Sequence, residues 1–321
     1  MSFTLNKIPL FQELEDSKTI LLAGAGGGFD IYSGIPLYFN LIKQGKKVIL
    51  ANLSFTWLSH VTSEQVFPYC YKIKSGDSDF SRRNYFPEKY LKLWLGMQGE
   101  LAHIYAFDRI GVNPLKDAYK YLIKEHDIDT IVLVDGGTDS LMFGDEEGLG
   151  TPQEDICSMA AVYRSGIKKQ FLVSVGFGID HYHGVSHFRF LENVAKIAKE
   201  GGYLGTFQIT KEMQEAQLYI DAVKFANKQM KGMESIVSNS IVTALEGEYG
   251  NHHSTHRTKG SELWINPLMT IFWSFDNRKV VEQIKYYDYI KDIYTMGEFN
   301  GQLMKYRNEL KHIREKRQMP I

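Results

Sequence analysis

The chain has 321 residues, of which 44% are hydrophobic and 23% are charged, so it can bury a large core and is not disordered, collagen-like or a coiled coil. Its 37 Lys and Arg residues nearly balance its 38 Asp and Glu residues, which excludes a strongly basic surface that would recruit nucleic acid or an anionic membrane. Two cysteines cannot build a disulfide framework, and no uncharged apolar run approaches the ~20 residues that span a bilayer. The sequence therefore predicts a soluble cytoplasmic protein.

The N-terminal part predicts a strand, a glycine turn, a helix and a second strand. Residues 19–24 form an apolar run, residues 25–30 are glycine-rich, and a helical stretch ending near 45 leads to a second apolar run at 47–52. This order predicts a βαβ unit with parallel strands and a right-handed connection. Because both strands are continuously apolar, helices are expected on both faces of the sheet.

The alternation of strands and helices resumes after an irregular, aromatic-rich stretch at 61–105, which we interpret as an insertion or lid. Residues 1–321 show no repeat or break in composition, so one elaborated α/β domain is expected. The later elements are predicted as helices at 113–125, 151–164, 187–200, 211–230 and 297–317, and as strands at 130–134, 170–175 and 269–273.

The glycine turn after the first strand is the first candidate site. Glycines let the backbone approach a ligand, and amides at a helix start can bind an anion. The dinucleotide fingerprint is incomplete, since Phe29 replaces its third glycine and Asn52 stands where an acidic residue is expected. The turn therefore predicts a phosphate, ribose or carboxylate site, and a tight turn that serves packing alone remains the alternative. The candidate binding residues are Gly24, Gly26, Gly27, Gly28 and Asp30.

The window 135–155 is the second candidate site, with seven carboxylates and neither Lys nor Arg. Crowded carboxylates repel, and a divalent cation or the hydroxyls of a sugar would relieve that repulsion. Asp135 and Asp139 are predicted to be catalytic, and Asp145 and Glu146 are metal-ligand candidates, although the spacing does not match an EF-hand. Alternatively, the later acids face water or complement the start of the next helix. Gly136, Gly137 and Thr138 are the substrate-binding candidates of this window.

Residues 176–187 form the third candidate segment. Asp180 is predicted to act as an acid or base beside His181 and His183, whereas Ser186 could cap the next helix. Farther along, the stretch 251–257 contains three histidines but lacks the glutamate of the zinc-protease motif. Its last residue, Arg257, is the better candidate, as a cation that clamps a phosphate or carboxylate.

Four segments together resemble the prokaryotic family catalogued as domain of unknown function 1152. They are Gly-Ala-Gly-Gly-Gly-Phe-Asp at 24–30, Val-Asp-Gly-Gly-Thr-Asp-Ser at 134–140, Gly-Asp-Glu-Glu-Gly-Leu-Gly-Thr-Pro at 144–152 and Phe-Trp-Ser-Phe-Asp at 272–276. The resemblance implies a cytoplasmic protein with a Rossmann-like three-layer fold, a mostly parallel sheet, helices on both faces and an irregular insertion. It brings no established reaction.

The convergence of three polar loops at strand ends favours an enzyme that acts on a nucleotide-like or phosphorylated small molecule by hydrolysis or group transfer. In this hypothesis the glycine amides and Arg257 bind an anionic ligand, and two carboxylates in different environments divide the acid and base roles. A sensor that binds without turnover and a metal-dependent hydrolase are the alternatives. The sequence identifies no cofactor, leaves a divalent metal open, and is compatible with a homo-oligomer.

Overall fold

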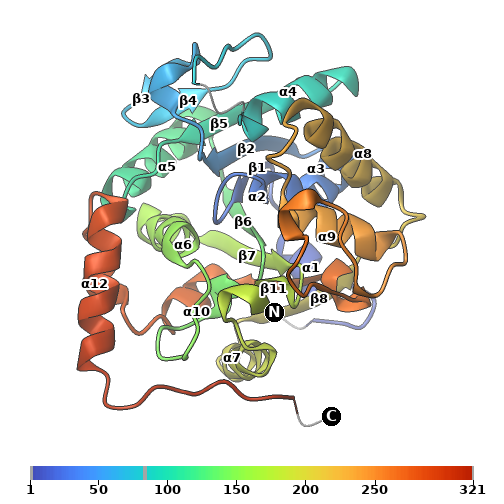
Figure 1. Cartoon of the computed structure of the whole chain (residues 1–321). Coiled ribbons are helices and arrows are strands. Elements are labelled where there is room, and N and C mark those ends of the chain that lie inside the picture. Colours follow the sequence, from blue (N-terminus) through green and yellow to red (C-terminus); the bar gives the residue numbers. More distant parts are fainter. Residues whose placement is uncertain (1–2, 82–84, 320–321) are drawn as a thin grey trace.

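The computed structural model describes residues 3–81 and 85–319, and a nine-stranded sheet runs through the centre of this part of the chain (Figure 1). The strand order is β3-β4-β5-β2-β1-β6-β7-β11-β8. The strands are β1 (Thr19–Gly24), β2 (Lys47–Leu53), β3 (Glu64–Phe67), β4 (Cys70–Lys72), β5 (His103–Phe107), β6 (Thr130–Gly136), β7 (Lys169–Val175), β8 (Tyr203–Gln208) and β11 (Ile271–Asp276), with β9 (Gly250–Asn251) and β10 (Trp264–Ile265) forming a separate pair.

The five central strands are parallel, and their order fixes where a ligand can bind. β5, β2, β1, β6 and β7 pair in parallel, whereas β4 and β11 run against their neighbours. From β1 the chain first builds the sheet outward through β2 and then returns to add β6 on the other side. The gap between the ends of β1 and β6 is therefore the topological switch point, where ligands of such folds bind.

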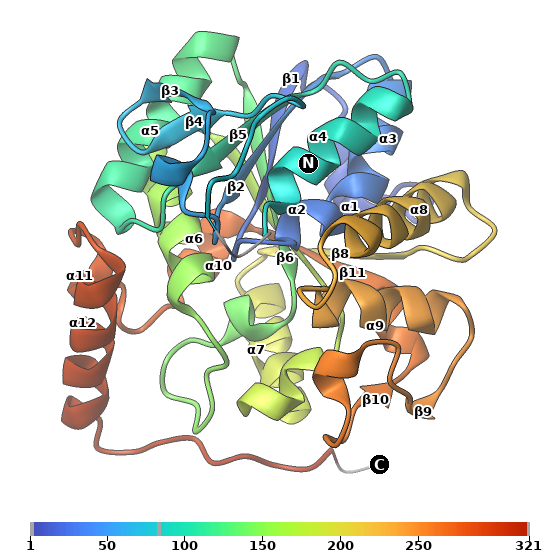
Figure 2. The same ribbon diagram turned by 45° about the horizontal axis from the view of Figure 1, so that its top comes forward.

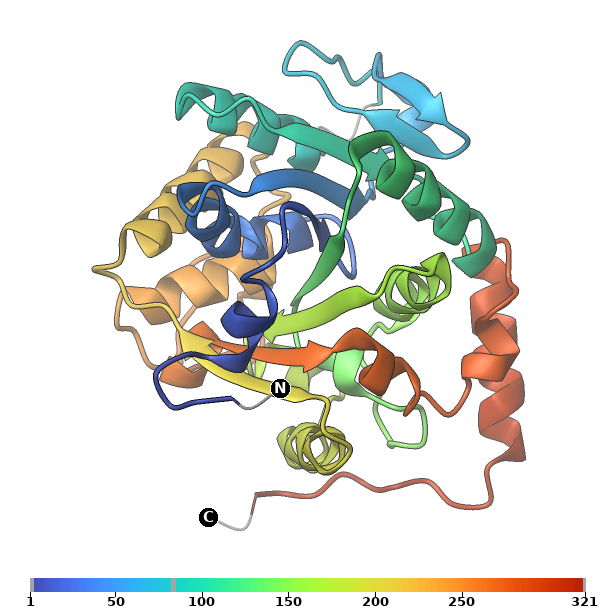
Figure 3. The same cartoon turned by 180° about the vertical axis from the view of Figure 1, so that it is seen from behind.

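Helices cover both faces of the sheet, which makes the fold α/β, Rossmann-like and three-layered, as predicted (Figures 1 and 3). One face carries α1 (Pro9–Glu13), α2 (Asp30–Ser33), α3 (Ile35–Lys43), α4 (Pro87–Met97), α8 (Gln214–Gln229) and α9 (Ile236–Leu245). The other carries α5 (Val112–His126), α6 (Gln153–Ser165), α7 (His187–Lys199), α10 (Asn277–Val281), α11 (Tyr287–Ile290) and α12 (Met296–Glu309). Short 3₁₀ helices are η1 (Leu58–His60), η2 (Asp139–Leu141), η3 (Ile179–His183), η4 (His256–Thr258) and η5 (Pro267–Thr270). None of the helices in the described part of the chain is long and apolar enough to cross a membrane.

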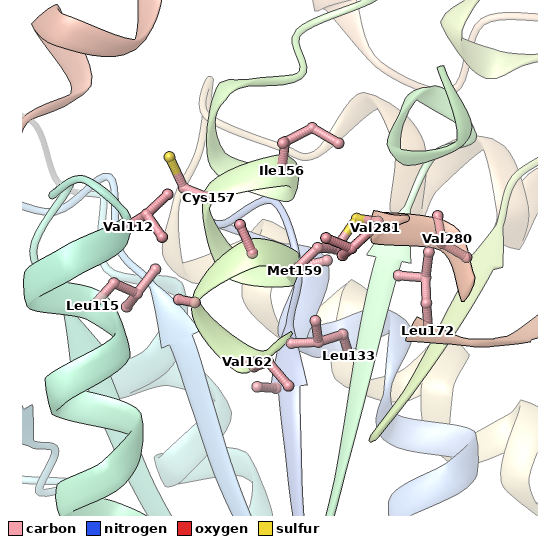
Figure 4. Close-up of a cluster of buried hydrophobic side chains, with 14 of the residues drawn as sticks. Val112, Leu115, Leu133, Ile156, Cys157, Met159, Val162, Leu172, Val280 and Val281 are labelled. Atoms are coloured by element: carbon pink, nitrogen blue, oxygen red, sulfur yellow. The ribbon is translucent and has the colours of Figure 1, made fainter. Parts of the chain in front are cut away.

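Helix α6 is fixed by a buried apolar cluster between α5, α10 and the sheet (Figure 4). Ile156 and Met159 of α6 lie with Leu115 of α5, Leu133 of β6 and Val281 of α10, and all five are at most 2% exposed. Truncating a side chain such as Met159 to Ala in a core of this kind costs about 2–5 kcal/mol. The packing matters for function because it holds the first turn of α6 against the end of β6.

The stretch 61–105 is more regular than the sequence suggested. β3 and β4 form an antiparallel hairpin that extends one edge of the sheet, and α4 follows, with Pro87 in its first turn. The stretch ends inside the parallel strand β5. Hairpin strands of three and four residues are too short for the alternation of a strand to stand out in a sequence.

The last helix is shorter than the predicted helix at 297–317, because it ends at Glu309. The chain then runs extended past the 144–148 loop and α7 (Figure 1). The backbone N–H of Arg314 donates to the carbonyl of Asp145 at 2.7 Å, and that of Glu147 donates to the carbonyl of Arg314 at 2.9 Å. Pairing with a distant loop thus takes the backbone groups that a longer helix would use. We call residues 310–319 the C-terminal strap.

Candidate functional site

A cavity of about 420 Å³ lies at the switch point, at the carboxyl ends of β1 and β6. Figure 2 shows α2 beside the end of β6, with α9 nearby. The three polar loops meet here, as the parallel strand order predicts. The lining includes Gly26, Gly27, Asp30, Asp135, Gly136, Asp139, Asp155, Asp180 and Arg257.

The glycine turn does not offer its amides to a ligand, contrary to the prediction. The carboxylate of Asp30 folds back and accepts hydrogen bonds from the backbone N–H groups of Gly26 at 2.7 Å and Gly27 at 3.1 Å. The N–H of Gly28 donates to the carbonyl of Leu53 at 3.0 Å. The turn therefore holds a carboxylate of the protein itself, and this carboxylate faces the cavity.

Two of the glycines in the turn serve packing and do not line the cavity. A Cβ atom on Gly24 would lie 2.1 Å from Oδ1 of Asn52, and one on Gly28 would lie 2.8 Å from the ring of Phe55. Gly28 also has a positive φ of 60°, which favours glycine. The packing alternative thus holds for Gly24 and Gly28.

Asp135 is the penultimate residue of β6 and Asp139 begins η2, and both are nearly buried in the cavity wall. Asp135 accepts a hydrogen bond from the hydroxyl of Ser140. Oδ2 of Asp139 accepts from the N–H of Thr151 at 2.8 Å and from its hydroxyl at 3.1 Å. Each carboxylate is thus oriented by a hydrogen-bond donor from the same 135–155 window. Thr151 reaches Asp139 because the window folds back on itself.

The two glycines between these aspartates make room for carboxylates. A Cβ atom on Gly137 would lie 2.9 Å from an oxygen of Asp180, 3.1 Å from one of Asp135 and 3.3 Å from one of Asp139. Gly136 lines the cavity, and a Cβ atom there would lie 2.9 Å from Oδ1 of Asp30. Their role in the structure is thus to let carboxylates from three loops approach one another.

Asp180 comes from the third loop, in η3, and joins the same wall. Its Oδ2 accepts from the N–H of Thr138 at 2.6 Å and from the Thr138 hydroxyl at 3.2 Å. Thr138 itself does not line the cavity, so it positions Asp180 instead of meeting a ligand. Of the two histidines, exposed His183 lines the cavity, whereas His181 stacks on His187 with ring centroids 5.3 Å apart.

Asp155 is the site residue that sequence reasoning missed. It lies in the first turn of α6, where an acid is readily explained by the helix dipole. The residue is only 4% exposed, and its Oδ1 has no hydrogen-bond partner among the described residues. A Cβ atom on Gly26 would lie 2.8 Å from this Oδ1, so the unpartnered oxygen faces the glycine turn. In the sequence, the sign that Asp155 could belong to the site is its place in the acid-rich window 135–155.

Three carboxylates from α2, β6 and α6 are close enough to share one cation. One oxygen each of Asp30, Asp135 and Asp155 lie within 4.8 Å of one another. Carboxylate oxygens are the preferred ligands of Mg²⁺ and Ca²⁺. We call these three residues the site triad.

Burial shifts the proton affinity of all these carboxylates in the same direction. It raises the pKa of Asp30 from 3.8 to about 7, and it raises the pKa values of Asp135, Asp155 and Asp180 well above 3.8. The pKa of Asp139 is also raised by burial, against the hydrogen bonds from Thr151. Neighbouring carboxylates add to the effect of burial on the triad. Ionising the whole group at neutral pH therefore requires a counter-charge in the cavity.

The cavity also has groups that favour negative charge. Arg257 is exposed, lines the cavity and is held by a 2.6 Å hydrogen bond from Nη1 to the carbonyl of Glu234. Ser235, Ile236 and Val237 bring the N-terminus of α9 to the cavity. A helix N-terminus and an arginine both favour an anionic group.

Asp145 and Glu146 lie outside the cavity, which contradicts their prediction as metal ligands. Asp145 pairs with Lys285 and, at 2.8 Å, with Arg314. Glu146 pairs with Arg314 and accepts from Asn193 Nδ2 at 2.7 Å. Although burial opposes the shift, the two cations lower the pKa of Asp145. These carboxylates already have their counter-charges.

Comparison with known proteins identifies the family but no reaction. Residues 91–315 match the family described as Protein of unknown function (DUF1152), which is more than half of the chain, so the chain belongs to this family. The loops that follow β6 and β7 lie within the match, whereas the glycine turn precedes it. Comparisons with curated proteins and with solved structures give no match.

Proposed function

We propose that this member of the family is a divalent-metal-dependent enzyme that acts on a phosphorylated or nucleotide-like small molecule by hydrolysis or group transfer. The observation that carries the proposal is the unpartnered Oδ1 of buried Asp155, within reach of Asp30 and Asp135. A buried carboxylate oxygen without a donor costs free energy. A cation bound by the site triad would remove that cost.

The residues of the site fit a hard cation. Asp30, Asp135 and Asp155 supply oxygen ligands from α2, β6 and α6, and the packing of α6 and the short turn of α2 hold them in place. Mg²⁺ or Mn²⁺ bound there would act as a Lewis acid on a phosphoryl oxygen. The amides of the glycine turn hold the Asp30 carboxylate toward the cation.

The remaining groups divide the other tasks. Arg257 and the N-terminus of α9, which line the same cavity, hold the anionic part of the substrate. Asp180, held by Thr138 and with a raised pKa, accepts the proton of the attacking nucleophile. Asp139 is the second candidate for this role, but Thr151 stabilises its charged form.

The first experiment tests whether the protein binds a divalent cation. Thermal unfolding of chelator-treated protein is measured with Mg²⁺, Mn²⁺ or Ca²⁺, and for Asp155→Asn and Asp135→Asn in parallel. Asp117→Asn, at an exposed position of α5, is the matched control. The proposal expects stabilisation of about 2–3 kcal/mol at 100 times the dissociation constant in the wild type and the control only. Absence of stabilisation in the wild type would refute the metal centre.

The second experiment tests whether the protein converts a bound compound into a product. Nucleotides and sugar phosphates are incubated with the metal-loaded protein, and products are identified by mass spectrometry. The proposal expects a new product whose formation requires the metal and Asp155. Recovery of a tightly bound compound unchanged would show a sensor in place of an enzyme.

A further inference from the structure

We propose that a second cleft beside the metal centre binds a planar nucleobase, so that the substrates are nucleotides. The inference rests on the proposed function and narrows its substrate class. It comes from a region of the molecule that the metal centre does not use.

The second cleft has a volume of about 1040 Å³ and adjoins the first cavity. Phe55, Thr151 and Glu154 line both spaces. The walls of the cleft come from the loop after β2 at 54–59, the loop after β5 at 108–109, the loop into α6, and Asn300 and Leu303 of α12. The two spaces therefore share a wall, and in this proposal a ligand held at the triad extends along it into the cleft.

Aromatic side chains are unusually exposed in this cleft. Phe55 is 38% exposed and Trp57 is 50% exposed, although both follow a buried strand. The ring of Phe55 lies against Gly27 and Gly28, since Cβ atoms there would approach it to 3.3 and 2.8 Å. Its orientation is thus fixed by the same turn that holds Asp30 of the triad.

A fixed guanidinium group accompanies these rings. Cζ of Arg109 lies 5.3 Å from the centroid of the Phe55 ring. Nε of Arg109 donates to Oε1 of Glu154 at 2.9 Å, and its Nη2 bonds the same oxygen. Guanidinium planes and aromatic rings are the surfaces on which proteins stack unpaired bases. Glu154 directly precedes Asp155 in α6, which couples this surface to the metal centre.

Polar groups for the edge of a base line the same cleft. The carboxamides of Gln153 and Asn300 are hydrogen-bonded to each other at 2.5 Å and lie at the junction of α6 and α12. Carboxamides offer a donor and an acceptor to a base edge. The cleft thus combines stacking faces with edge contacts, whereas a simple sugar phosphate would leave the stacking faces unused.

The test compares binding of adenosine monophosphate and guanosine monophosphate with binding of ribose 5-phosphate, by titration calorimetry with Mg²⁺ present. We expect at least one of the nucleotides to bind about 10-fold tighter or more, the contribution of one stacked base. Trp57→Ala and Arg109→Met should reduce this preference to about 2-fold or less, and both should keep the Mg²⁺ stabilisation. Tyr249→Ala, at an aromatic side chain that is 69% exposed elsewhere, should change nothing.

The outcomes separate the two proposals. Equal binding of ribose 5-phosphate and both nucleotides, with Mg²⁺ stabilisation intact, overturns the base subsite alone. Failure of Mg²⁺ to stabilise the wild type overturns the metal centre on which the inference rests. If Trp57→Ala leaves nucleotide binding unchanged but converts a dimer to a monomer in sedimentation velocity, the cleft is a contact between copies of the chain and the inference is wrong.

Discussion

Two groups of acids in this molecule have opposite electrostatic surroundings. The site triad, Asp30, Asp135 and Asp155, is packed against further carboxylates, and burial raises their pKa values. The strap cluster, which we define as Asp145, Glu146 and Glu192, contacts Arg314 of the C-terminal strap. Burial alone would raise the pKa values of Asp145 and Glu192. Hydrogen bonds from arginines and Lys285 outweigh it and lower both pKa values.

The comparison shows that density of acids in the sequence is a poor guide to function. Asp135, Asp155, Asp145 and Glu146 all come from one window. Arg314, from the far end of the chain, pairs with Asp145 and Glu146, whereas Oδ1 of Asp155 has no hydrogen-bond partner among the described residues. Buried charge without a partner destabilises a fold, so the triad is the group that calls for a functional explanation.

The largest expected effect is a loss of turnover when a residue of the site triad is replaced. Asp155→Asn should lower turnover about 1000-fold, because losing a metal ligand removes several kcal/mol of transition-state stabilisation. Unfolding of the metal-free variant should require at least as much free energy as the wild type, since one repelling charge is gone. Steady-state kinetics and urea denaturation measure the two quantities. Turnover above a tenth of the wild-type value would remove Asp155 from the reaction.

The second-largest expected effect distinguishes the strap cluster from the site triad by its contribution to stability. Arg314→Met leaves Asp145, Glu146 and Glu192 without their shared cation, and we expect a loss of about 3 kcal/mol in the free energy of unfolding. Arg278→Met is the control, because its pair with Asp276 is half exposed and should contribute less than about 1 kcal/mol. Urea denaturation is the measurement. A loss for Arg314→Met no larger than the control's would contradict the comparison.

The pH dependence of stability should have opposite signs in the two groups. Folded, metal-free protein keeps a proton on Asp30, with a pKa of about 7, that the unfolded chain releases near 3.8. The contribution of Asp30 therefore falls as pH rises from about 4 to about 7. Asp145 has a lowered pKa, so its contribution is present above 3.8 and is lost as pH falls through the folded pKa.

Urea denaturation in chelator at pH 5 and pH 7 measures this difference. The isosteric variant Asp30→Asn can still accept from the glycine amides, yet it cannot titrate. We expect the wild type to lose about 1–3 kcal/mol more than this variant between the two pH values. Added Mg²⁺ should reverse the trend, because metal binding requires deprotonated carboxylates. An identical pH profile for the variant would show that Asp30 carries no raised pKa.

The fold and the position of the site could be predicted from local sequence patterns. Continuous apolar runs such as 19–24 and 130–134 indicate buried parallel strands, and parallel strands bring Asp30, Asp135 and Asp180 to one edge. These inferences need only short-range patterns and the chirality of βαβ units.

The details of the site depended on contacts that no local pattern encodes. Arg314 pairs with Asp145 from 169 residues away, so its loop looked free in the sequence. Asp30 fills the glycine turn that seemed ready for an external anion. Asp155 lies in the first turn of α6, where an acid complements the helix dipole, so its sequence position has an ordinary explanation. In each case the role of a charged side chain depends on its partner in space more than on its neighbours in the sequence.

The smallest effect we predict probes the space within the carboxylate group. Gly137 has no positive φ, so Gly137→Ala is not strained in its backbone, but its Cβ would lie 2.9 Å from Asp180 and 3.1 Å from Asp135. We expect a loss of about 1 kcal/mol in stability, and a weaker Mg²⁺ response in thermal unfolding. Gly96→Ala in α4, with open space around it, should be neutral or stabilising by up to about 1 kcal/mol. A Mg²⁺ response that changes with a methyl group at Gly137 but not at Gly96 would place the cation among these carboxylates. Equal responses would place it elsewhere.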